Sequence, residues 1–382
     1  MEVSSPLSKE KWRLLAICSI IFSIGHALRV LISPYLGVLQ NVLNLSYAQT
    51  VLLYSSYDVG YMVGLFVIFL FGGMSVVSRG IMVVPVVYLL GLVFSFLSSS
   101  FLELFTSRFF LGFATGIYLT HGLDLLSYAF HKTERGKMMG YHSIGSSVGR
   151  LYGSLIGGFI SAMFGWREPF LFLAIISGLV TIPSLLVLRN VKIRASSVRY
   201  TELKRIMPHV FIYGIALFFF LSSVSLFPLY FSNIMELRSD VIGVLLAIVT
   251  FTTIVANPII GVLSDRYEKR KVISVLFLIC TILSVCLPFV RNIWEAVFFS
   301  VALGITVTSP IQIMLAIITC VADDERRSSA IGYFNGASFL LSLLTLNIFG
   351  KLVEVLGLQL VITLIGAVTL FGVSLTLRFL RD

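Results

Sequence analysis

Residues 241–271 read VIGVLLAIVTFTTIVANPIIGVLSDRYEKRK, and this stretch decides the fold class. The run from Val241 to Ser264 contains no Asp, Glu, Lys or Arg, and a strongly charged loop follows it. An apolar run of roughly 20 residues is long enough to cross the ~30 Å hydrocarbon core of a bilayer as a helix. The segment therefore predicts a membrane-spanning helix that ends in a basic loop.

Seven other runs without a charged residue reach this length or nearly so, and four further apolar segments each contain a charge. The other uncharged runs are Gly80–Leu102, Pro169–Leu188, Ile206–Met235, Val272–Val290, Ala296–Ala322, Ser328–Gly350 and Val355–Leu377. The segments with a charge lie at about 13–36, 47–71, 104–127 and 138–164. The eight uncharged runs and the four segments with a charge together predict an all-α membrane protein with twelve transmembrane helices.

The composition excludes a water-soluble globular enzyme. Of the 382 residues, 58% are hydrophobic and 12% are charged, whereas a soluble domain has about 25% charged residues. The mean hydropathy is +1.00. The net charge of +10 does not indicate a nucleic-acid partner, because the basic residues lie in short loops between apolar runs and not on a soluble face.

No motif for catalysis, metal binding or nucleotide binding is present in the sequence. The four cysteines lie in apolar segments without CxxC spacing, which favours buried thiols over a zinc site or a disulfide framework. The sequence also lacks GxxxxGK[ST], HExxH and a nucleophile elbow. We therefore expect no cofactor and no enzymatic activity. The acidic residues of the first twelve positions, with no small-residue cleavage site after them, favour a short tail over a signal peptide.

The distribution of basic residues predicts the orientation. With twelve spans and both termini in the cytoplasm, only Arg167, Arg238, Arg291 and Lys351 of the 28 Lys and Arg residues lie in outer loops. Basic residues favour the cytoplasmic side of a membrane. We therefore expect a multi-pass protein of the plasma or inner membrane with both termini in the cytoplasm.

The polar stretch Arg189–Arg205 divides the spans into two sets of six. We expect an N-terminal bundle at 1–188, a cytoplasmic linker at 189–207 and a C-terminal bundle at 208–382. The linker is either a short amphipathic helix against anionic lipid or a solvated basic loop.

The two halves contain related segments. ERGKMMGY at 134–141, after span four, parallels ERRSSAIGY at 325–333, after span ten. GGMSVVSRG at 72–80 is a weaker parallel of GVLSDRYEKRK at 261–271. Internal repeats of this kind are typical of transporters whose two halves rock about a central binding site.

These motifs resemble those of the major facilitator superfamily over essentially the whole chain. The family pattern GxLxDRxGRR is matched after span eight by Gly261, Leu263, Asp265, Arg266, Arg270 and Lys271, with Glu268 replacing a Gly. The copy after span two retains only Gly72, Gly73 and Arg79. The resemblance implies a cytoplasmic charge latch, and for it we expect Asp265, Arg266 and Arg270 as gating residues.

Two further patterns and one turn resemble the family. The family pattern LxxxRxxxG of span four is matched by Leu104, Arg108, Gly112 and Gly116. The antiporter motif of span five is matched by Gly140, Gly149, Gly153, Gly157 and Gly158, with Ser154 in place of Pro. The outer turn before span six is matched by GWREPF at 165–170. Glycines four residues apart also line one helix face and allow close helix packing in lipid. We expect this structural role for the span-five set and for Gly60 and Gly64 in span two.

Charged side chains inside the first bundle indicate the site. Arg29, Asp58, Arg108 and Arg150 lie in spans one, two, four and five. The resemblance implies that these spans surround the central cavity. A charge in lipid is costly and usually faces protein or a water-filled cavity. We therefore expect the four side chains to converge in the outer-to-middle layer, whereas Asp124 lies nearer the cytoplasm and needs no special role.

Three arginines and one aspartate leave an excess of positive charge in that layer. Because the guanidinium fork binds carboxylate or phosphate bidentately, we predict that Arg29 and Arg150 bind an organic anion. Arg29 also resembles, in the run RVLIS, the span-one arginine of facilitators for organic anions. Asp58 and Arg108 are predicted to couple protons; a permanent Asp58–Arg108 pair that fixes helix packing is the alternative. His26 and His142 lie nearby and either titrate near neutral pH or serve packing.

The second bundle has only neutral polar groups in its cavity spans. We select Asn257, Gln312 and Asn335 as substrate-binding candidates; such groups either bind a substrate or bridge helices.

The predicted function is secondary transport of a small organic anion, coupled to protons and driven by rocking of the two bundles. The expected partners are a small-molecule substrate, protons and membrane lipid, and we expect a monomer. The alternatives are a drug/proton antiporter and a transporter-like sensor, with a membrane-embedded enzyme least favoured.

Overall fold

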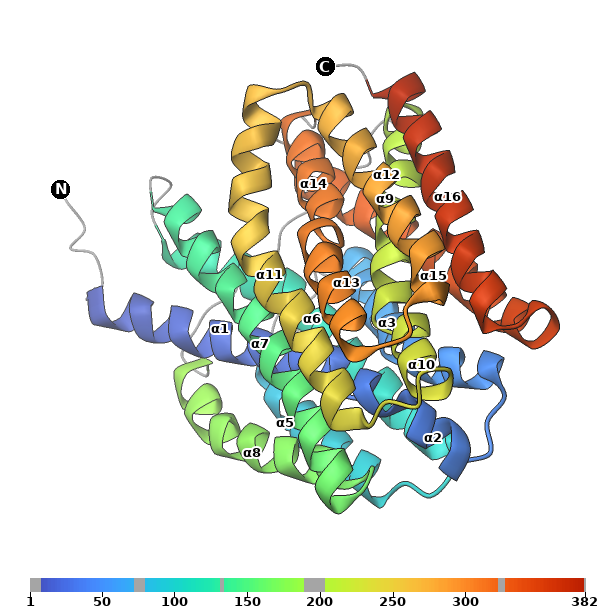
Figure 1. Ribbon diagram of the computed structural model, residues 1–382. Coiled ribbons are helices and arrows are strands. Elements are labelled where there is room, and N and C mark those ends of the chain that lie inside the picture. Colours follow the sequence, from blue (N-terminus) through green and yellow to red (C-terminus); the bar gives the residue numbers. More distant parts are fainter. Residues whose placement is uncertain (1–7, 72–79, 131–133, 189–202, 322–326, 381–382) are drawn as a thin grey trace. The chain divides into compact units, whose positions relative to one another are not determined.

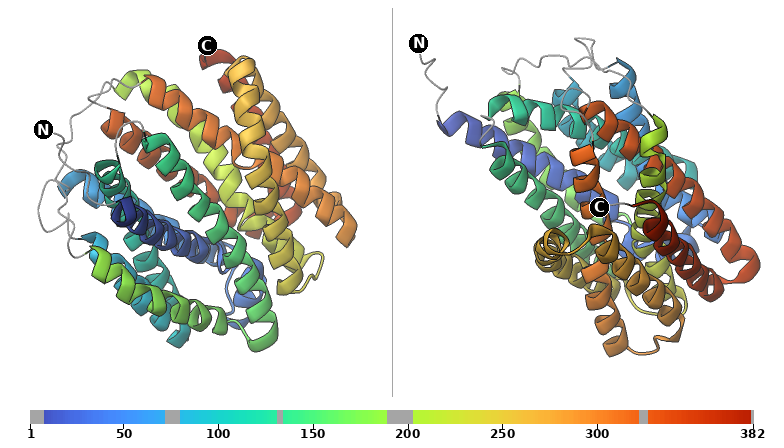
Figure 2. Two further views of the ribbon diagram at one scale, coloured as in Figure 1. Left: turned by 90° about the vertical axis from the view of Figure 1, so that its left-hand side faces the viewer. Right: turned by 90° about the horizontal axis from the view of Figure 1, so that it is seen from above.

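The structure is a computed structural model that describes residues 8–71, 80–130, 134–188, 203–321 and 327–380 (Figure 1). Its described residues form helices and no strand (Figure 2). In the first half the helices are α1 (Ser8–Val30), η1 (Ser33–Tyr35), α2 (Leu36–Val42), α3 (Tyr47–Phe71), α5 (Gly80–Leu97), α6 (Phe101–Ala129), α7 (Arg135–Phe164) and α8 (Glu168–Leu188). In the second half they are α9 (Leu203–Ser223), α10 (Leu226–Asn233), α11 (Ser239–Arg266), α12 (Lys269–Cys286), η2 (Leu287–Phe289), α13 (Ile293–Thr306), α14 (Ser309–Val321), α15 (Arg327–Leu356) and α16 (Leu358–Phe379).

The helices coincide with the predicted spans, and the all-α membrane fold is confirmed. Among the described residues, 9 helical segments are long and apolar enough to cross a membrane. The other three predicted spans fall on α5, α6 and α7. The apolar part of α5 is shorter, α6 contains charged residues, and α7 is rich in Gly and Ser. The count of twelve spans is therefore confirmed only in part.

Several spans are interrupted where the backbone cannot continue a regular helix. Pro34 lies in η1, between α1 and α2, and Pro310 is the second residue of α14, just after the break from α13. Proline has no backbone N–H and fits the first turn of a helix better than its interior. Pro85, Pro183 and Pro258 nevertheless lie inside α5, α8 and α11. At each of these three positions the helix lacks one backbone hydrogen bond.

The chain divides into two compact units that interleave along the sequence. Unit 1 comprises residues 1–31, 56–156 and 167–197, and unit 2 comprises residues 32–55, 157–166 and 198–382. Two helices are therefore divided between the units: α3 begins in unit 2 and continues in unit 1 from residue 56, and α7 begins in unit 1 and continues in unit 2 from residue 157. The predicted division into bundles 1–188 and 208–382 stays a prediction, and most of the predicted linker, residues 189–202, lies outside the described residues.

Unit 1 is held together by helices that approach each other at small residues. A Cβ added to Gly60 of α3 would overlap the carbonyl oxygen of Phe109 on α6, and one added to Gly112 of α6 would overlap the carbonyl oxygen of Tyr57 on α3. Gly149 of α7 is as close to the backbone of Ser23 on α1. Small residues that bring backbones into contact are a common packing mode in lipid. Gly60, Gly64, Gly149 and Gly153 have the close-packing role expected for spans two and five, whereas nothing lies within 4 Å of a Cβ at Gly140, so the expectation is wrong for that position.

Unit 2 combines an aromatic core with polar contacts to two short segments from the first half. The rings of Phe219 and Phe299 each lie 5.9 Å from the ring of Phe227. Asn233 Nδ2 donates to Gln40 Oε1 at 2.7 Å, which joins the end of α10 to α2. Segment 32–55 thus packs with the second half of the chain rather than with the rest of α1 and α3.

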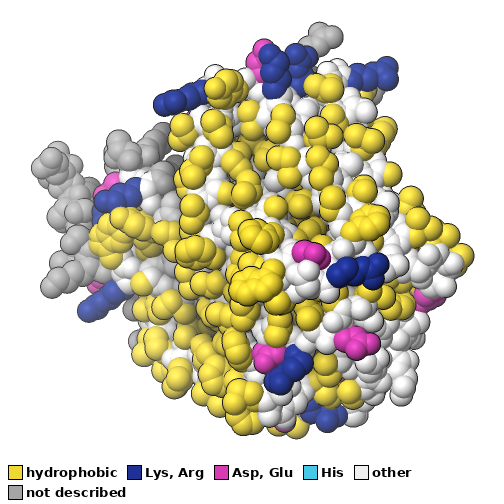
Figure 3. Space-filling view, viewed as in Figure 1, with side chains coloured by type: hydrophobic (Ala, Val, Ile, Leu, Met, Phe, Trp, Pro, Cys, Tyr) yellow, Lys and Arg dark blue, Asp and Glu magenta, His cyan; other side chains and the backbone are white. Residues whose placement is uncertain are grey.

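Large apolar side chains remain exposed on many helices. Leu179 is 74% exposed, Phe298 75% and Val355 80%. Hydrophobic side chains cover most of the face drawn in Figure 3. A soluble monomer rarely exposes extensive contiguous apolar surface, and these side chains suit contact with acyl chains instead.

The close packing of α3 and α6 makes Gly112→Ala destabilising. The added methyl group would meet backbone atoms, which cannot move aside as a side chain can, and we expect the free energy of unfolding to fall by about 1–3 kcal/mol. Gly140→Ala is the matched control, because nothing lies within 4 Å of a Cβ at this helical position; it should raise stability by up to about 1 kcal/mol. Denaturant unfolding of the purified protein measures both. Equal effects of the two substitutions would contradict the packing argument.

Candidate functional site

The side chains of Arg29 and Asp58 form an ion pair between α1 and α3. Asp58 is fully buried, and Arg29 is 8% exposed. The guanidinium carbon of Arg29 also lies 5.5 Å from the ring centroid of Tyr61, one turn after Asp58 on α3. The pair is thus formed by Arg29 and not by Arg108, which was the partner in the packing alternative.

Arg108 on α6 is held within the helix packing. Its side chain is fully buried, Nη1 donates to the carbonyl oxygen of Leu28 at 3.3 Å, and the guanidinium carbon lies 5.7 Å from the ring centroid of Tyr57. Tyr57 in turn donates to the carbonyl oxygen of Gly25 at 2.6 Å. Arg108 therefore fixes the end of α1 beside the ion pair, and its positive charge acts on Asp58.

Arg150 on α7 has a different environment. It is partly exposed, and Nη2 donates to Ser147 Oγ at 3.4 Å, one turn earlier on the same helix. Among the described side chains, no carboxylate lies within ion-pair distance of it. The positive charge of Arg29 acts on Arg150, so the two predicted substrate-binding arginines lie in one electrostatic environment.

Of the four charged residues, Arg29 and Asp58 are in direct contact and Arg108 lies against α1 beside them, whereas the convergence of Arg150 with this group stays a prediction. Arg29, Asp58, Arg108 and Arg150 all belong to unit 1. The positive charges of Arg29 and Arg108 act on the Asp58 carboxylate, and with Arg150 these residues carry an excess of two positive charges. The side chain of Asp124 lies outside the described residues.

The two predicted histidines differ in their hydrogen bonds. His142 Nε2 lies 2.9 Å from the hydroxyl of Tyr118, and this hydroxyl donates to the carbonyl oxygen of Cys18. His142 is therefore the donor in its contact, because the Tyr118 proton is already used. His26 is partly exposed, and its buried Nδ1 has no hydrogen-bond partner. The positive charges of Arg150 and Arg29 act on the His26 ring.

The aromatic residues around the charges are not among the candidates selected from the sequence. Tyr57 and Tyr61 lie beside Asp58 on α3, and their rings lie under Arg108 and Arg29. The helical spacing of the sequence could have indicated Phe22, because Phe22, His26 and Arg29 lie four and three residues apart and so share one face of α1. The ring of Phe22 stacks on His142 with centroids 4.3 Å apart and an interplanar angle of 20°.

The three polar candidates of the second half lie in unit 2, and two of them, Asn257 and Asn335, form hydrogen bonds with residues outside their own helices. Asn257 Nδ2 donates to Thr308 Oγ1 at 3.0 Å, and Asn257 Oδ1 accepts from Ser309 Oγ at 3.1 Å. Asn335 Oδ1 accepts from the Tyr213 hydroxyl at 3.0 Å. Gln312 is exposed. The substrate-binding roles of Asn257, Gln312 and Asn335 stay predictions.

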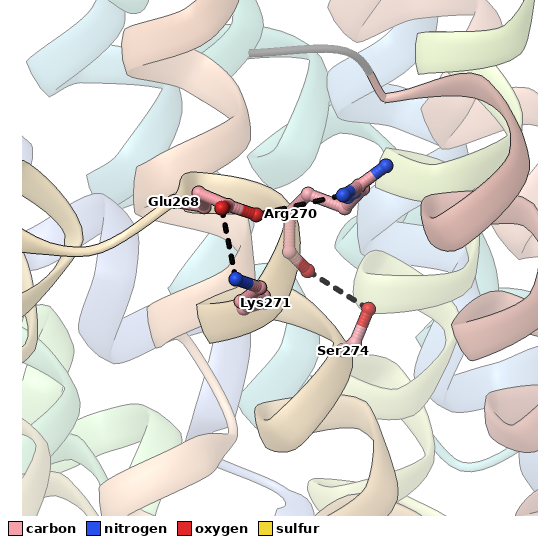
Figure 4. Close-up of polar contacts among 4 residues, drawn as sticks. All are labelled: Glu268, Arg270, Lys271 and Ser274. Atoms are coloured by element: carbon pink, nitrogen blue, oxygen red, sulfur yellow. Dashed lines mark hydrogen bonds and ion pairs between the residues drawn. The ribbon is translucent and has the colours of Figure 1, made fainter.

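The charged loop between α11 and α12 forms local ion pairs. Glu268 accepts from Lys271 Nζ at 2.8 Å and from Arg270 Nη2 at 3.5 Å, and Ser274 Oγ donates to the carbonyl oxygen of Arg270 at 2.8 Å (Figure 4). The hydrogen bond from Lys271 lowers the pKa of the Glu268 carboxyl. Glu268, which replaces a Gly of the family pattern, thus pairs with two of the basic residues at the start of α12.

Part of the predicted latch is beyond what the structure describes. Asp265 and Arg266 are exposed, and their gating role, with that of Arg270, stays a prediction. Gly72, Gly73 and Arg79 of the first-half copy lie outside the described residues, and so does Glu325 of the repeat after span ten.

Comparison with known proteins adds a family and several relatives. A sequence profile described as "Major Facilitator Superfamily" matches residues 15–238 and 210–382. The riboflavin transporter RibZ of Clostridioides difficile (strain 630) is 24% identical over 242 residues, which are 49% of this chain and 53% of RibZ. The chain thus spans about half of the length of this curated relative.

Solved structures with a similar fold cover nearly the whole chain. A POT family transporter in complex with 5-aminolevulinic acid has a TM-score of 0.81 at 11% identity and covers 97% of this chain and 96% of its own. A bacterial homologue of the human lysosomal transporter Spinster, inward-facing and occupied, has a TM-score of 0.79 at 14% identity and covers 98% of both chains. At these identities the likeness extends to the fold alone.

The buried ion pair predicts non-additive effects of its two residues. Arg29→Gln or Asp58→Asn alone leaves one buried charge without its partner, and we expect each to lower the free energy of unfolding by about 3–5 kcal/mol. The double variant removes both charges and should recover most of this loss. Denaturant unfolding of the three variants measures the coupling. Glu268→Gln, which breaks an exposed pair, is the control and should change stability little. Additive losses in the double variant would show that the pair is not coupled.

Proposed function

The chain belongs to the Major Facilitator Superfamily, and we propose that it is a secondary transporter that carries a small organic anion together with protons. The family and the matched relatives are transporters and not enzymes, and the chain is a multi-pass membrane protein of this family. The bundles 1–188 and 208–382 would alternate access to the site by rocking. We place the protein in a plasma or inner membrane with both termini in the cytoplasm.

The observation that carries the anion proposal is the environment of Arg150. Arg29 has Asp58 as its counter-ion, whereas Arg150 is partly exposed and has no carboxylate within ion-pair distance among the described side chains. A guanidinium group in a membrane-spanning segment is costly unless it faces protein or a water-filled cavity. An anionic substrate would supply the missing charge, and a carboxylate or phosphate matches the guanidinium fork.

Proton coupling follows from the sharing of Arg29 between two anions. While Asp58 is ionised, it occupies Arg29. Protonation of Asp58 would release Arg29, so that Arg29 and Arg150 together would bind the substrate. Departure of the anion would restore the pair and release the proton. Transport of one proton with one monovalent anion would then move no net charge. Arg108, fixed against Leu28 and Tyr57, would keep α1 in register with the pair.

Arg150→Gln tests the anion site. Ligand-induced shifts of the melting temperature would be measured with purified wild-type protein against citrate, inorganic phosphate, 3-phenylpropanoate and amphipathic cations. We expect at least one anion to stabilise the wild type and to lose about tenfold or more in affinity in the variant, because a charge-assisted contact is worth about 1.5–3 kcal/mol. Arg238→Gln, at an exposed outer position, is the control and should bind like the wild type.

Other outcomes of this screen decide between the remaining functions. Stabilisation by cations alone would favour the drug antiporter and contradict the anion site. Anion binding without flux in reconstituted vesicles would favour the sensor.

Asp58→Asn tests the coupling. The asparagine side chain imitates a permanently protonated Asp58, so Arg29 should be available to the anion at every pH. We expect the variant to exchange substrate across vesicles while losing accumulation driven by a pH gradient, and to gain more stability from the bound anion than the wild type does. Flux with an imposed pH gradient measures this directly. Unaltered pH-driven accumulation in the variant would exclude Asp58 from coupling.

A further inference from the structure

A stack of three rings in unit 1 has one partly exposed member, which lies one turn from His26. Phe22, Tyr118 and His142 are nearly parallel, with interplanar angles of 28° between Phe22 and Tyr118 and 14° between Tyr118 and His142. Tyr118 is fully buried and His142 is 2% exposed, whereas Phe22 is partly exposed. Phe22 is therefore the one member of this stack that is not buried.

The stack is held in place before any ligand arrives. The Tyr118 hydroxyl donates to the carbonyl oxygen of Cys18 and accepts from His142 Nε2. His142 in turn lies against the ring of Phe22, and His26 meets the same ring edge-on with centroids 4.5 Å apart. A preorganised aromatic surface costs little entropy on binding.

The same face of α1 leads from the ring stack to the cationic groups. Phe22, His26 and Arg29 follow each other at helical spacing, and seven residues along a helix span about 10 Å. At the far end of this stripe, Arg29 lies over Tyr61, and Arg150 acts electrostatically on His26 between the two ends. A ligand that uses both ends therefore combines an anionic group with an aromatic ring.

We propose that the substrate is an aromatic carboxylate, with its carboxylate at Arg29 and Arg150 and its ring against Phe22. His26 lies between the two groups, and a polar substituent there would find the ring nitrogens of His26 as partners. The proposal rests on the proposed function, because it names the substrate class of the same site. An aliphatic chain would fill the same space without the preference of aromatic rings for stacked or edge-to-face contacts.

The test compares 3-phenylpropanoate with 3-cyclohexylpropanoate, which share the carboxylate and the carbon skeleton. The saturated ring is the more hydrophobic of the two, so burial alone favours 3-cyclohexylpropanoate. Stacking reverses this order, and we expect wild-type protein to bind 3-phenylpropanoate about two- to tenfold more tightly. Titration calorimetry on the purified full chain measures both affinities.

Substitutions at Phe22 show which ring is responsible. Phe22→Leu should abolish the preference for the aromatic acid while retaining binding of both, and Phe22→Tyr should keep the preference. Phe110→Leu, at an exposed position on α6, is the matched control and should behave like the wild type. Arg150→Gln should weaken both acids equally.

Each remaining result contradicts the proposal in a recognisable way. Equal or tighter binding of 3-cyclohexylpropanoate, or a preference that survives in Phe22→Leu, would overturn the aromatic class. Binding of citrate or inorganic phosphate that depends on Arg150, without binding of either ring-bearing acid, would overturn it while leaving the anion site intact. Failure of all four anions to bind would overturn the anion site as well.

Discussion

The cost of placing an ionised side chain in hydrocarbon is the constraint on which this structure depends. Asp58 is fully buried, and an isolated carboxylate there would be strongly destabilising. Its ion pair with Arg29 and the positive charge of Arg108 offset that cost. The positions of α1, α3 and α6 around these residues are therefore linked, because the carboxylate on α3 is stabilised by a positive charge from each of the other two helices.

Small residues make this arrangement of charges possible. Gly60 and Gly112 allow the backbones of α3 and α6 to meet, and Gly149 allows α7 to reach α1. Arg29 and Arg150 lie within these contacting helices. Since a methyl group at either of the first two positions would overlap a carbonyl oxygen, the charged site and the close packing are not independent. The glycines are structural residues, but the geometry of the site depends on them.

The two halves of the chain contribute different chemistry. The charged residues inside spans belong to unit 1, whereas the polar candidates Asn257 and Asn335 bridge helices within unit 2. Hydrogen bonds between neutral side chains in membranes are worth roughly 0.6–2 kcal/mol, too little to hold a charged solute by themselves. The proposed recognition of a charged substrate therefore rests on the residues of the first half.

The sequence by itself determined the helical class, most of the spans and the set of charged residues, because apolar runs of membrane length and rare intramembrane charges are local features of composition. Helical spacing also indicated that Gly60 and Gly149 pack against neighbouring helices, but it failed for Gly140. Only the tertiary structure decided that Asp58 pairs with Arg29, that Arg108 bonds to the backbone of α1, and that Arg150 stays partly exposed. Partner choice among several arginines depends on helix rotation and on distances of a few ångströms between helices, and neither is encoded in the spacing along one chain segment.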